Sequence, residues 1–417
     1  MVVAGLVPFT VLVLILFGTA YSLVVWQPPL LQTTQFGIAN SGNGITALVA
    51  DRTGVYAAGY SGFSFSDPGV SNVNSTYPFV NKYDFNGHQV WSQHIAGPIP
   101  PWMDASVGTD GLYVAGGQFF LANANSSFVR KYDISGNEVW NIQFGNWSAT
   151  SISVSPSGVY VGGDNRTAYV VDGYSLSGTL LWTRLFGTGA GNIYVRSSPD
   201  GVYVVAEDGS LQEFGLDGTL TWARSCSCDV TGLSGESAYF YIVGDAPTSK
   251  GTYDGFLSKY DSSGDQIWTK SFSAPGFNSI RKVKAAADSS GIYLTATGAG
   301  IGGIAMKFDS NGNMMWSVQL PLDTGFGIAW SDAIALGDSA AYIGGSSGSD
   351  RVNLAFLTIL EKASSLIFFG LNPPFSFVLA GLLVAGSALS ILWFRRQRLK
   401  KRRIPGARGI YRPQKTR

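Results

Sequence analysis

KYDFNGHQVW, residues 82–91, is the stretch that decides the fold, because the chain repeats it. Five later segments keep a glycine four residues before a tryptophan, usually after Lys-Tyr-Asp. Successive tryptophans are 49, 42, 40, 46 and 48 residues apart. A period in this range, with turn residues inside each copy, is typical of a propeller blade or a solenoid unit. The later copies are KYDISGNEVW (131–140), GYSLSGTLLW (173–182), EFGLDGTLTW (213–222), KYDSSGDQIW (259–268) and KFDSNGNMMW (307–316).

A second segment recurs seven times: a tyrosine that opens a short apolar run, usually ending in glycine. Most copies follow a turn rich in Gly, Asp and Ser. Short apolar runs bounded by such turns predict strands joined by tight hairpins. The tyrosines are Tyr56, Tyr113, Tyr160, Tyr203, Tyr241, Tyr293 and Tyr342.

Seven tyrosine segments and six tryptophan segments leave one strand missing, and the N-terminal region supplies a candidate. QTTQFG, residues 32–37, is similar to the WNIQFG that begins at Trp140. Gln32 precedes Tyr56 by 24 residues, and each tryptophan precedes the next tyrosine by 19 to 26. We therefore predict an all-β, seven-bladed propeller over residues 27–362, in which residues 31–37 complete the last blade. Pairing the first and last segments removes exposed sheet edges.

Both ends of the chain predict export to the plasma membrane. Residues 374–394 are 21 residues without a charge, long enough for a transmembrane helix, and residues 363–373 link them to the propeller. The tail, residues 395–417, is basic and is therefore expected in the cytoplasm, with the propeller outside. Residues 1–26 predict either a signal peptide or an uncleaved anchor. Proline residues at the start of the C-terminal helix leave open that it is cut off in the mature protein.

The formal net charge of +1 hides a strong asymmetry. All 27 acidic residues lie between Asp51 and Lys362, together with 17 basic ones, so this region has a formal charge of −10. The other 11 basic residues are in the tail. We expect the tail to orient the chain and to hold anionic lipid head groups, and we expect no nucleic-acid partner.

Four sequons and two cysteines agree with export. Asn-x-Ser/Thr is the acceptor sequence for N-glycosylation. Cys226 and Cys228 offer too few ligands for a metal site, and they predict a local disulfide. The Asp-x-Asn-Gly turns offer only two or three oxygens, too few for calcium, so neither a metal nor a cofactor is expected. The sequons stand at Asn74, Asn125, Asn146 and Asn165.

The combination of GxYVxG with KYDxxGxxxWxxxFG resembles the bacterial and archaeal propeller repeats called SBBP repeats. It also resembles, more loosely, the pyrroloquinoline-quinone-type propeller repeats, as in LDGTLTW, residues 216–222. The resemblance implies a surface or periplasmic protein with binding or scaffolding work. With its predicted anchor, basic tail and sequons, the chain looks most like an archaeal surface protein. The resemblance does not specify an activity, because propellers host unrelated functions.

The chain carries little catalytic equipment. Its two histidines, His88 and His94, fall in a predicted turn and in the strand after it. It contains no haem-attachment motif, phosphate-binding glycine loop, metalloprotease motif or Gly-x-Ser-x-Gly elbow. We therefore predict that the protein is not an enzyme.

Three aspartates are candidate ligand-binding residues. Asp104, Asp229 and Asp332 stand 9 or 10 residues before a tyrosine of the following strand region, where the innermost strand is expected to begin. Three carboxylates around one axial opening would hold a cation or a polar ligand. The alternative is that they cap turns or face solvent.

Three tryptophans outside the repeated position are a second set of candidates. Trp102, Trp147 and Trp330 fall in predicted connections between strands. Exposed aromatic residues in loops are platforms for sugar rings. The alternative is that they pack along blade edges.

The leading hypothesis is a membrane-anchored, non-enzymatic propeller that binds surface proteins or glycans. The rival is an exported enzyme, either a glycan hydrolase or lyase or a quinone-dependent dehydrogenase. A third possibility is a purely structural component of the envelope. The rival gains if the three aspartates converge beside a basic residue such as Arg281, and it loses if they point outward.

Overall fold

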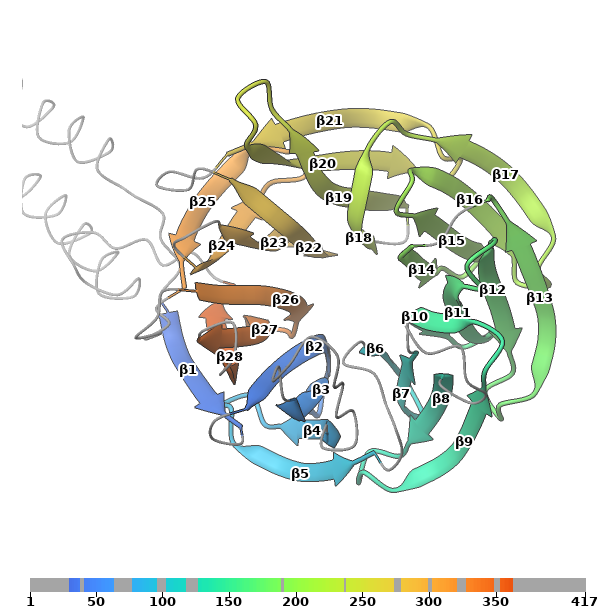
Figure 1. The fold of residues 1–417 in the computed structure, drawn as a ribbon, viewed down its shortest axis with the longest axis horizontal. Coiled ribbons are helices and arrows are strands. Elements are labelled where there is room, and N and C mark those ends of the chain that lie inside the picture. The colour runs from blue at the N-terminus through green and yellow to red at the C-terminus, as the bar shows by residue number, and fades with distance from the viewer. Residues whose placement is uncertain are drawn as a thin grey trace, which may run out of the picture. The chain divides into compact units, whose positions relative to one another are not determined.

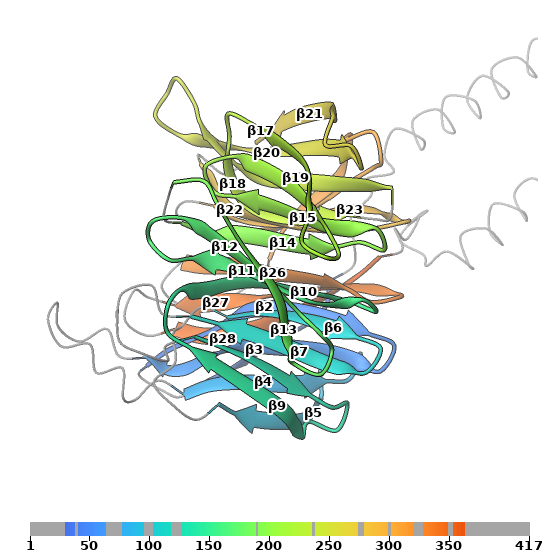
Figure 2. The ribbon, with the colours of Figure 1, turned by 90° about the vertical axis from the view of Figure 1, so that its right-hand side faces the viewer.

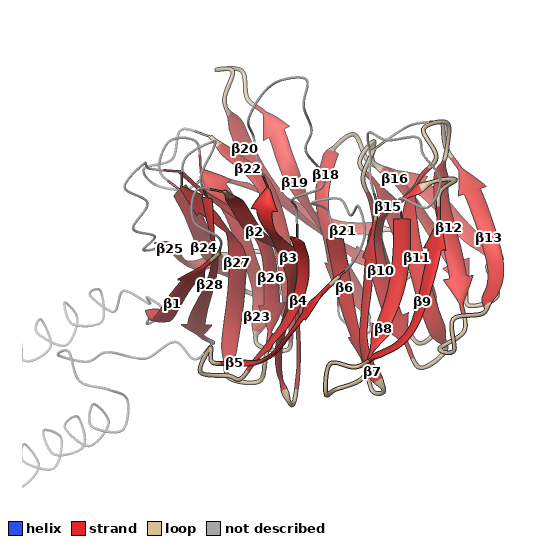
Figure 3. Cartoon of the chain, turned by 60° about the horizontal axis from the view of Figure 1, so that its bottom comes forward, coloured by secondary structure: helices blue, strands red, loops and turns tan. Residues whose placement is uncertain are grey.

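The computed structural model describes residues 30–37, 41–63, 77–95, 103–117, 127–188, 191–235, 238–273, 279–298, 302–320, 328–348 and 353–362. All regular elements in these ranges are β-strands (Figure 3). Within them, no helix is long and apolar enough to cross a membrane. The predicted N-terminal segment, linker, transmembrane helix and basic tail lie outside the described residues.

In the described ranges, twenty-eight strands form seven four-stranded antiparallel sheets, arranged as blades around a common axis (Figure 1). Blades 1 to 6 each use four consecutive strands, from β2–β5 to β22–β25, and the lowest-numbered strand is innermost. Blade 7 has the order β26-β27-β28-β1 from the axis outward. The strands are β1 (Leu30–Phe36), β2 (Gly42–Asp51), β3 (Gly54–Phe63), β4 (Tyr77–Tyr83), β5 (Gln89–His94), β6 (Met103–Gly108), β7 (Gly111–Gly116), β8 (Ser127–Tyr132), β9 (Glu138–Phe144), β10 (Ser148–Ser155), β11 (Gly158–Asp164), β12 (Tyr169–Tyr174), β13 (Leu180–Phe186), β14 (Ile193–Ser197), β15 (Gly201–Ala206), β16 (Ser210–Gly215), β17 (Leu220–Ser225), β18 (Asp229–Gly235), β19 (Tyr239–Pro247), β20 (Tyr253–Asp261), β21 (Gln266–Phe272), β22 (Ile280–Asp288), β23 (Gly291–Gly298), β24 (Gly302–Phe308), β25 (Met314–Gln319), β26 (Ile328–Leu336), β27 (Ala340–Gly348) and β28 (Asn353–Glu361).

The predicted closure of the ring is confirmed. β1 pairs antiparallel with β28, with Gln32 opposite Ile359, which in turn is opposite Tyr342. In blade 2 the same ladder position belongs to Trp140. Trp140 is opposite Lys131, and Lys131 is opposite Tyr113. Gln32 therefore takes the place of the missing seventh tryptophan.

The apolar core is divided among the seven interfaces between blades. One buried cluster, for example, joins Tyr56 and Val80 of blade 1 to Met103 and Leu112 of blade 2. The tyrosine strands are buried over most of their length, as in β7 and β15, although β19 is exposed at its ends. The outermost strands consist mostly of exposed and partly exposed residues, as in β5. Figure 2 shows the ring of blades from the side. A continuous apolar run thus marks a strand inside the sheet, and a run that mixes apolar and polar residues marks the strand at its outer edge.

In blades 1, 2, 5 and 6 the repeated Asp and Gly form the hairpin turn before the outer strand. In blade 2 the Asp133 carboxylate accepts the backbone N–H groups of Ser135 at 2.8 Å and of Asn137 at 2.9 Å. Gly136 has a φ of 88°, a left-handed conformation that glycine adopts without steric cost. The oxygens of this turn are therefore used to hold the turn itself.

The repeated tryptophans of blades 1 to 5 pack on the turn of the next blade. The Trp182 Nε1–H group of blade 3 donates to the carbonyl of Leu216 in blade 4 at 2.9 Å. A Cβ added at Gly218 would come within 2.6 Å of the Trp182 ring, so only glycine lets the ring lie flat on this turn. Trp91 and Trp140 make the same hydrogen bond to blades 2 and 3. The repeat therefore encodes both a turn and the contact between blades.

Candidate functional site around the axis

The innermost strands bring three chemically distinct side chains to one level of the ring. Asp104 on β6, Tyr194 on β14 and Lys284 on β22 each pair with the residue two positions after the tyrosine of the neighbouring strand. They therefore occupy the same ladder position in blades 2, 4 and 6. We call these three residues, together with Arg281, Lys282, Asp245 and Asp332, the axial cluster.

Lys284 is the central cation of the axial cluster. Its Nζ donates to the carbonyl of Thr231 on β18 at 2.6 Å and lies 4.8 Å from the centre of the Tyr194 ring. Burial of the ammonium group lowers the pKa of Lys284, and the carboxylates of Asp332 and Asp104 partly oppose this shift. A cation is therefore kept near the axis at a cost in desolvation.

Asp104 links two blades. Its carboxylate accepts the hydroxyl of Ser151 at 3.0 Å and the backbone N–H of Ile152 at 2.9 Å, both on β10. Burial raises the pKa of Asp104, although these hydrogen bonds act in the opposite direction. Its oxygens are thus engaged in holding blade 2 to blade 3.

Threonines at bulges in the inner strands also join neighbouring blades. The ladders of β2, β10 and β18 each shift register by one residue, at Thr46, Thr150 and Thr231. Each hydroxyl donates to a backbone carbonyl of the next inner strand, at 3.0, 3.3 and 2.7 Å respectively. Three of the seven described inner strands therefore use a bulge with a threonine hydroxyl at this level, whereas β6 and β14 pair without a register shift.

Blades 6 and 7 depart from that solution. In β26 the bulge residue is Asp332, and its Oδ1 lies 3.5 Å from Nζ of Lys282 on β22. Lys282 itself lies at a register shift and has a φ of 55°, a left-handed conformation that costs a residue with a Cβ free energy. Burial together with the Asp332 carboxylate raises the pKa of Tyr60 to about 12. A strained lysine facing a carboxylate thus replaces the threonine contact.

Arg281 and Asp245 complete the axial cluster beside Lys282. Nε of Arg281 lies 2.6 Å from Oδ2 of Asp245, and the Arg281 guanidinium lies 3.8 Å from the centre of the Tyr253 ring. Oδ1 of Asp245 accepts the backbone N–H of Lys282 at 3.2 Å. Burial raises the pKa of Asp245, and Arg281 opposes the shift. The Asp245 side chain is 6% exposed, whereas those of Arg281 and Lys282 are 51% and 49% exposed. The Arg281 and Lys282 side chains are therefore exposed to solvent, and the Asp245 carboxylate is buried.

The three predicted aspartates do not form one set. Asp104 and Asp332 both act on Lys284, but each is engaged with a different blade contact. Asp229 is exposed and pairs with Asp245 at the start of β18. Within the described strands and turns, no group of three or more His, Cys, Asp or Glu side chains is arranged to hold a metal ion. Whether any of the three aspartates binds a ligand stays a prediction.

The three predicted tryptophans have different surroundings. Trp102 lies outside the described residues. Trp147 lies in a connection, with its ring centre 4.6 Å from that of Phe144, and it packs against Gly163. Trp330 lies inside β26, opposite Ser346, and its assignment to a connection was wrong. β26 begins before Trp330, because its pairing with β27 continues to Ile328 opposite Gly348.

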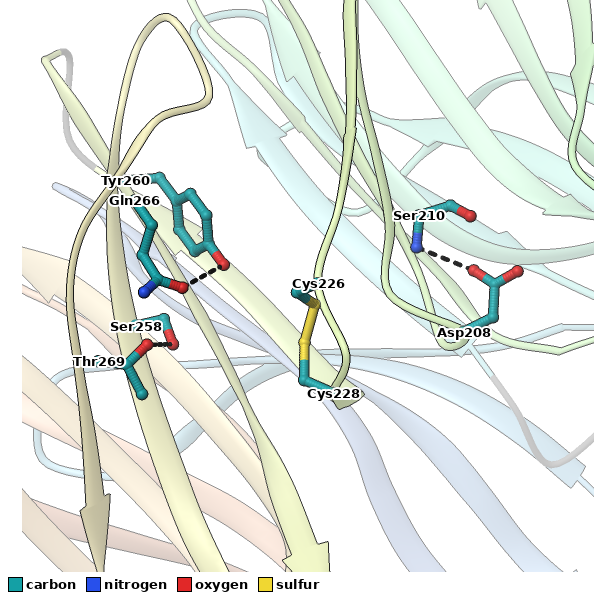
Figure 4. The surroundings of a disulfide bond; sticks show 8 residues. All are labelled: Asp208, Ser210, Cys226, Cys228, Ser258, Tyr260, Gln266 and Thr269. Atoms are coloured by element: carbon teal, nitrogen blue, oxygen red, sulfur yellow. Dashed lines mark hydrogen bonds between the residues drawn. A yellow bond between two sulfur atoms is a disulfide. The ribbon is translucent and has the colours of Figure 1, made fainter.

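The two cysteines form a disulfide between β17 and β18 (Figure 4). The Cys226 N–H donates to the carbonyl of Gly209 at 2.8 Å, which holds the link against the turn in blade 4. Both cysteines pack beside the apolar cluster between blades 4 and 5. Of the sequons, Asn146 and Asn165 are described, and Asn74 and Asn125 lie outside the described residues.

Reasoning from the sequence missed Tyr194, Lys282 and Lys284. Three basic residues within four positions, RKVK at 281–284, are a signal in an otherwise acidic propeller. The bulge that turns Lys282 toward Asp332 has no such signal, because it depends on pairing with β23.

A family model described as Outer membrane protein assembly factor BamB matches residues 125–246. The matched segment runs from blade 2 into blade 5, less than half of the chain, and ends before Arg281. It supports the likeness to pyrroloquinoline-quinone-type repeats, whereas nothing in it tests the SBBP type. One similar solved structure is BamB from Moraxella catarrhalis, at 12% identity and a TM-score of 0.48, covering 80% of this chain and 98% of that one. None of the curated proteins matches the chain.

Replacing Lys284 by methionine should change how stability depends on pH. The folded-state pKa of Lys284 lies below the ordinary value of 10.5, so between the two values the unfolded chain binds more protons than the folded chain. The stability of the wild type therefore rises with pH across this interval, and Lys284→Met removes that rise.

The measurement is the thermal midpoint from about pH 7 to about pH 9.5, below the ordinary tyrosine pKa of about 10. Replacing the exposed Lys270 of β21 by methionine is the matched control, and its curve should follow that of the wild type. Parallel curves for wild type and Lys284→Met would contradict the prediction.

Proposed function

We propose that this protein is a non-catalytic scaffold at the plasma membrane, whose outward-facing propeller binds a carboxylate-bearing segment of a surface protein. The predicted helix at residues 374–394 anchors it, and the basic tail lies in the cytoplasm. Contact with the partner is made by the half-exposed Arg281 and Lys282.

The main support for this proposal is that Lys282 and Asp332 replace the threonine contact found between other blades. Three other inner strands use a threonine hydroxyl at the bulge, whereas here a left-handed lysine faces a carboxylate. Strained residues and bulges are concentrated at functional sites, where a departure from the scaffold pattern needs a compensating gain. The Asp245 carboxylate holds the Arg281 guanidinium and the backbone N–H of Lys282, and Asp332 faces the Lys282 ammonium group. Both cations are half exposed, so the rest of their N–H groups can meet an acidic group of a partner.

A protein is the favoured type of partner. The matching family model is described as a factor in the assembly of outer membrane proteins, and this description supports protein binding in general. The engaged state of Asp104 supports a role other than catalysis, since its carboxylate already accepts bonds from β10. An acidic glycan would meet the same two cations, and identifying the bound partner separates the two cases.

Replacing Lys282 by glycine should weaken partner binding about tenfold, equivalent to about 1.4 kcal/mol. Glycine keeps the left-handed backbone without strain, so the fold should be retained or slightly stabilised. The measurement is quantitative cross-linking of the full chain in its own membranes, with cross-linked partner peptides identified by mass spectrometry.

Arg52→Gly is the matched control, because Arg52 is exposed in the turn between β2 and β3, away from the axial cluster. It should leave the yield of cross-links unchanged. The proposal fails if cross-links map away from residues 245–284, or if Lys282→Gly and wild type give equal yields.

A further inference from the structure

A cleft of about 450 Å³ separates the outer parts of blades 2 and 3. Ile142 and Phe144 of β9, with Trp147, line one wall. Asp172 of β12 lies opposite them, with Thr183 and Leu185 of β13. The cleft thus has apolar walls with one carboxylate, from Asp172, and two hydroxyl groups, from Thr183 and Tyr174.

At one position beside this cleft, blade 2 lacks the long cation that blades 3 and 4 carry. Two residues after the repeated tryptophan, blade 3 has Arg184, whose Nε donates to the carbonyl of Gly218 in blade 4 at 2.6 Å. Blade 4 has Arg224, which reaches to 3.7 Å from Asp265 of blade 5. Blade 2 has Ile142 at this position, which makes an apolar contact with the Gly178 turn of blade 3 and offers no polar group to it. Leu185 on the other wall of the cleft is 61% exposed.

A sequon stands at the edge of this cleft. Asn146 is exposed, lines the cleft and begins the sequence Asn146-Trp147-Ser148. Its position is fixed by its neighbour, since the Trp147 ring packs on Phe144 and the Trp147 carbonyl accepts the hydroxyl of Ser127 at 2.9 Å. Asn146 is therefore held with its side-chain amide at the opening.

The sequon on the opposite wall is used differently. The Asn165 side-chain oxygen accepts the hydroxyl of Thr167 and the backbone N–H of Ala168, both at 2.8 Å. This side chain holds its own turn, so it differs from Asn146 in being engaged within the fold.

We propose that Asn146 carries an N-linked glycan whose first sugars lie in the cleft between blades 2 and 3. The inference rests on the proposed location of the propeller outside the cell. The donor is an oligosaccharide linked through phosphate to an isoprenoid lipid. The Asn146 amide nitrogen forms a bond to the anomeric carbon, the bond from that carbon to the phosphate oxygen breaks, and the amide loses one proton as the lipid phosphate leaves.

Both the apolar walls of the cleft and its carboxylate suit a sugar ring. The apolar faces of a pyranose ring pack on Phe144 and Leu185. Its hydroxyl groups donate to the Asp172 carboxylate, whose oxygens each accept one bond already, from Thr183 at 2.6 Å and from Tyr174 at 2.8 Å, and keep further lone pairs. Because the sugar is attached at the edge of the cleft, its effective concentration there is high and weak contacts suffice to hold it.

The test uses the full chain purified from the cells that naturally make it. Glycopeptide mass spectrometry should find a glycan on Asn146, and hydroxyl-radical footprinting should find Leu185 and Phe144 protected. In Asn146→Gln the oxidation of both residues should rise severalfold. Asn141→Gln, the same change at an exposed position of β9 outside any sequon, should leave the oxidation unchanged.

Digestion of intact cells with an external protease separates the two proposals. Unmodified Asn146 in a chain whose propeller is digested overturns this inference and leaves the proposed function standing. A protected propeller overturns the proposed location and this inference with it. A glycan on Asn146 with equal oxidation of Leu185 in wild type and Asn146→Gln overturns the placement in the cleft, as does a partner peptide cross-linked there beside unmodified Asn146.

Discussion

Replacing Trp182 by alanine is expected to lower the free energy of unfolding of the propeller by about 3–5 kcal/mol, the usual cost of removing a buried tryptophan. The ring is 8% exposed and contacts Phe214 and the turn at Gly218 in blade 4. Its indole N–H also satisfies the carbonyl of Leu216. The substitution therefore removes apolar contact and a hydrogen bond at the same interface between blades.

The measurement is the urea midpoint of unfolding followed by tryptophan fluorescence and circular dichroism. Leu181→Ala is the matched control, because Leu181 precedes Trp182 on the same strand and is 59% exposed. Its effect should stay within about 0.5 kcal/mol. Equal midpoints for Trp182→Ala and Leu181→Ala would show that the tryptophan does not join the blades.

Deletion of β1, residues 30–36, from the full chain is expected to abolish cooperative unfolding of the propeller. Blade 7 would lose its outer strand, and the buried edge of β28 would become exposed. Phe36, whose ring contacts those of Phe79 and Tyr83 in blade 1, would be lost as well. This loss is comparable with the ~5–15 kcal/mol that stabilise a typical domain, and the new edge would favour aggregation.

Scanning calorimetry and light scattering of the detergent-solubilised chain provide the measurement. Thr33→Ser is the control, since serine keeps the hydroxyl that lies 3.0 Å from that of Thr358 across the β1–β28 pair. A deletion variant that still unfolds in a single sharp transition would mean that the ring does not depend on its N-terminal strand.

The number and closure of the blades were predictable because the signals are local and repeated. Asp133 and Gly136 make their turn within five residues, and the spacing to the next tyrosine identified residues 31–37 as the strand that completes the last blade. The role of the tryptophans as contacts between blades also followed, since a large flat ring recurring once per blade has one repeated neighbour.

The axial cluster was only partly predictable. The position of Asp104 before its tyrosine indicated the innermost strand, but its hydrogen bonds to Ser151 and Ile152 depend on how two sheets meet. Asp332 and Lys282 face each other because each lies at a register shift. A one-residue shift in a strand changes where its side chains point, and the shift is set by pairing rather than by composition.

The sequence by itself thus determined the blades, their order and the strand that closes the ring, because every repeat carries its own turn and strand signals. Only the tertiary structure decided which charges meet at the axis and where the ring is left open. Lys284 approaches Asp104 across 180 positions of the chain because ring closure brings separate blades to one level. Beside the cleft at Asn146, Ile142 of blade 2 packs on the Gly178 turn of blade 3, a contact that neither strand shows alone.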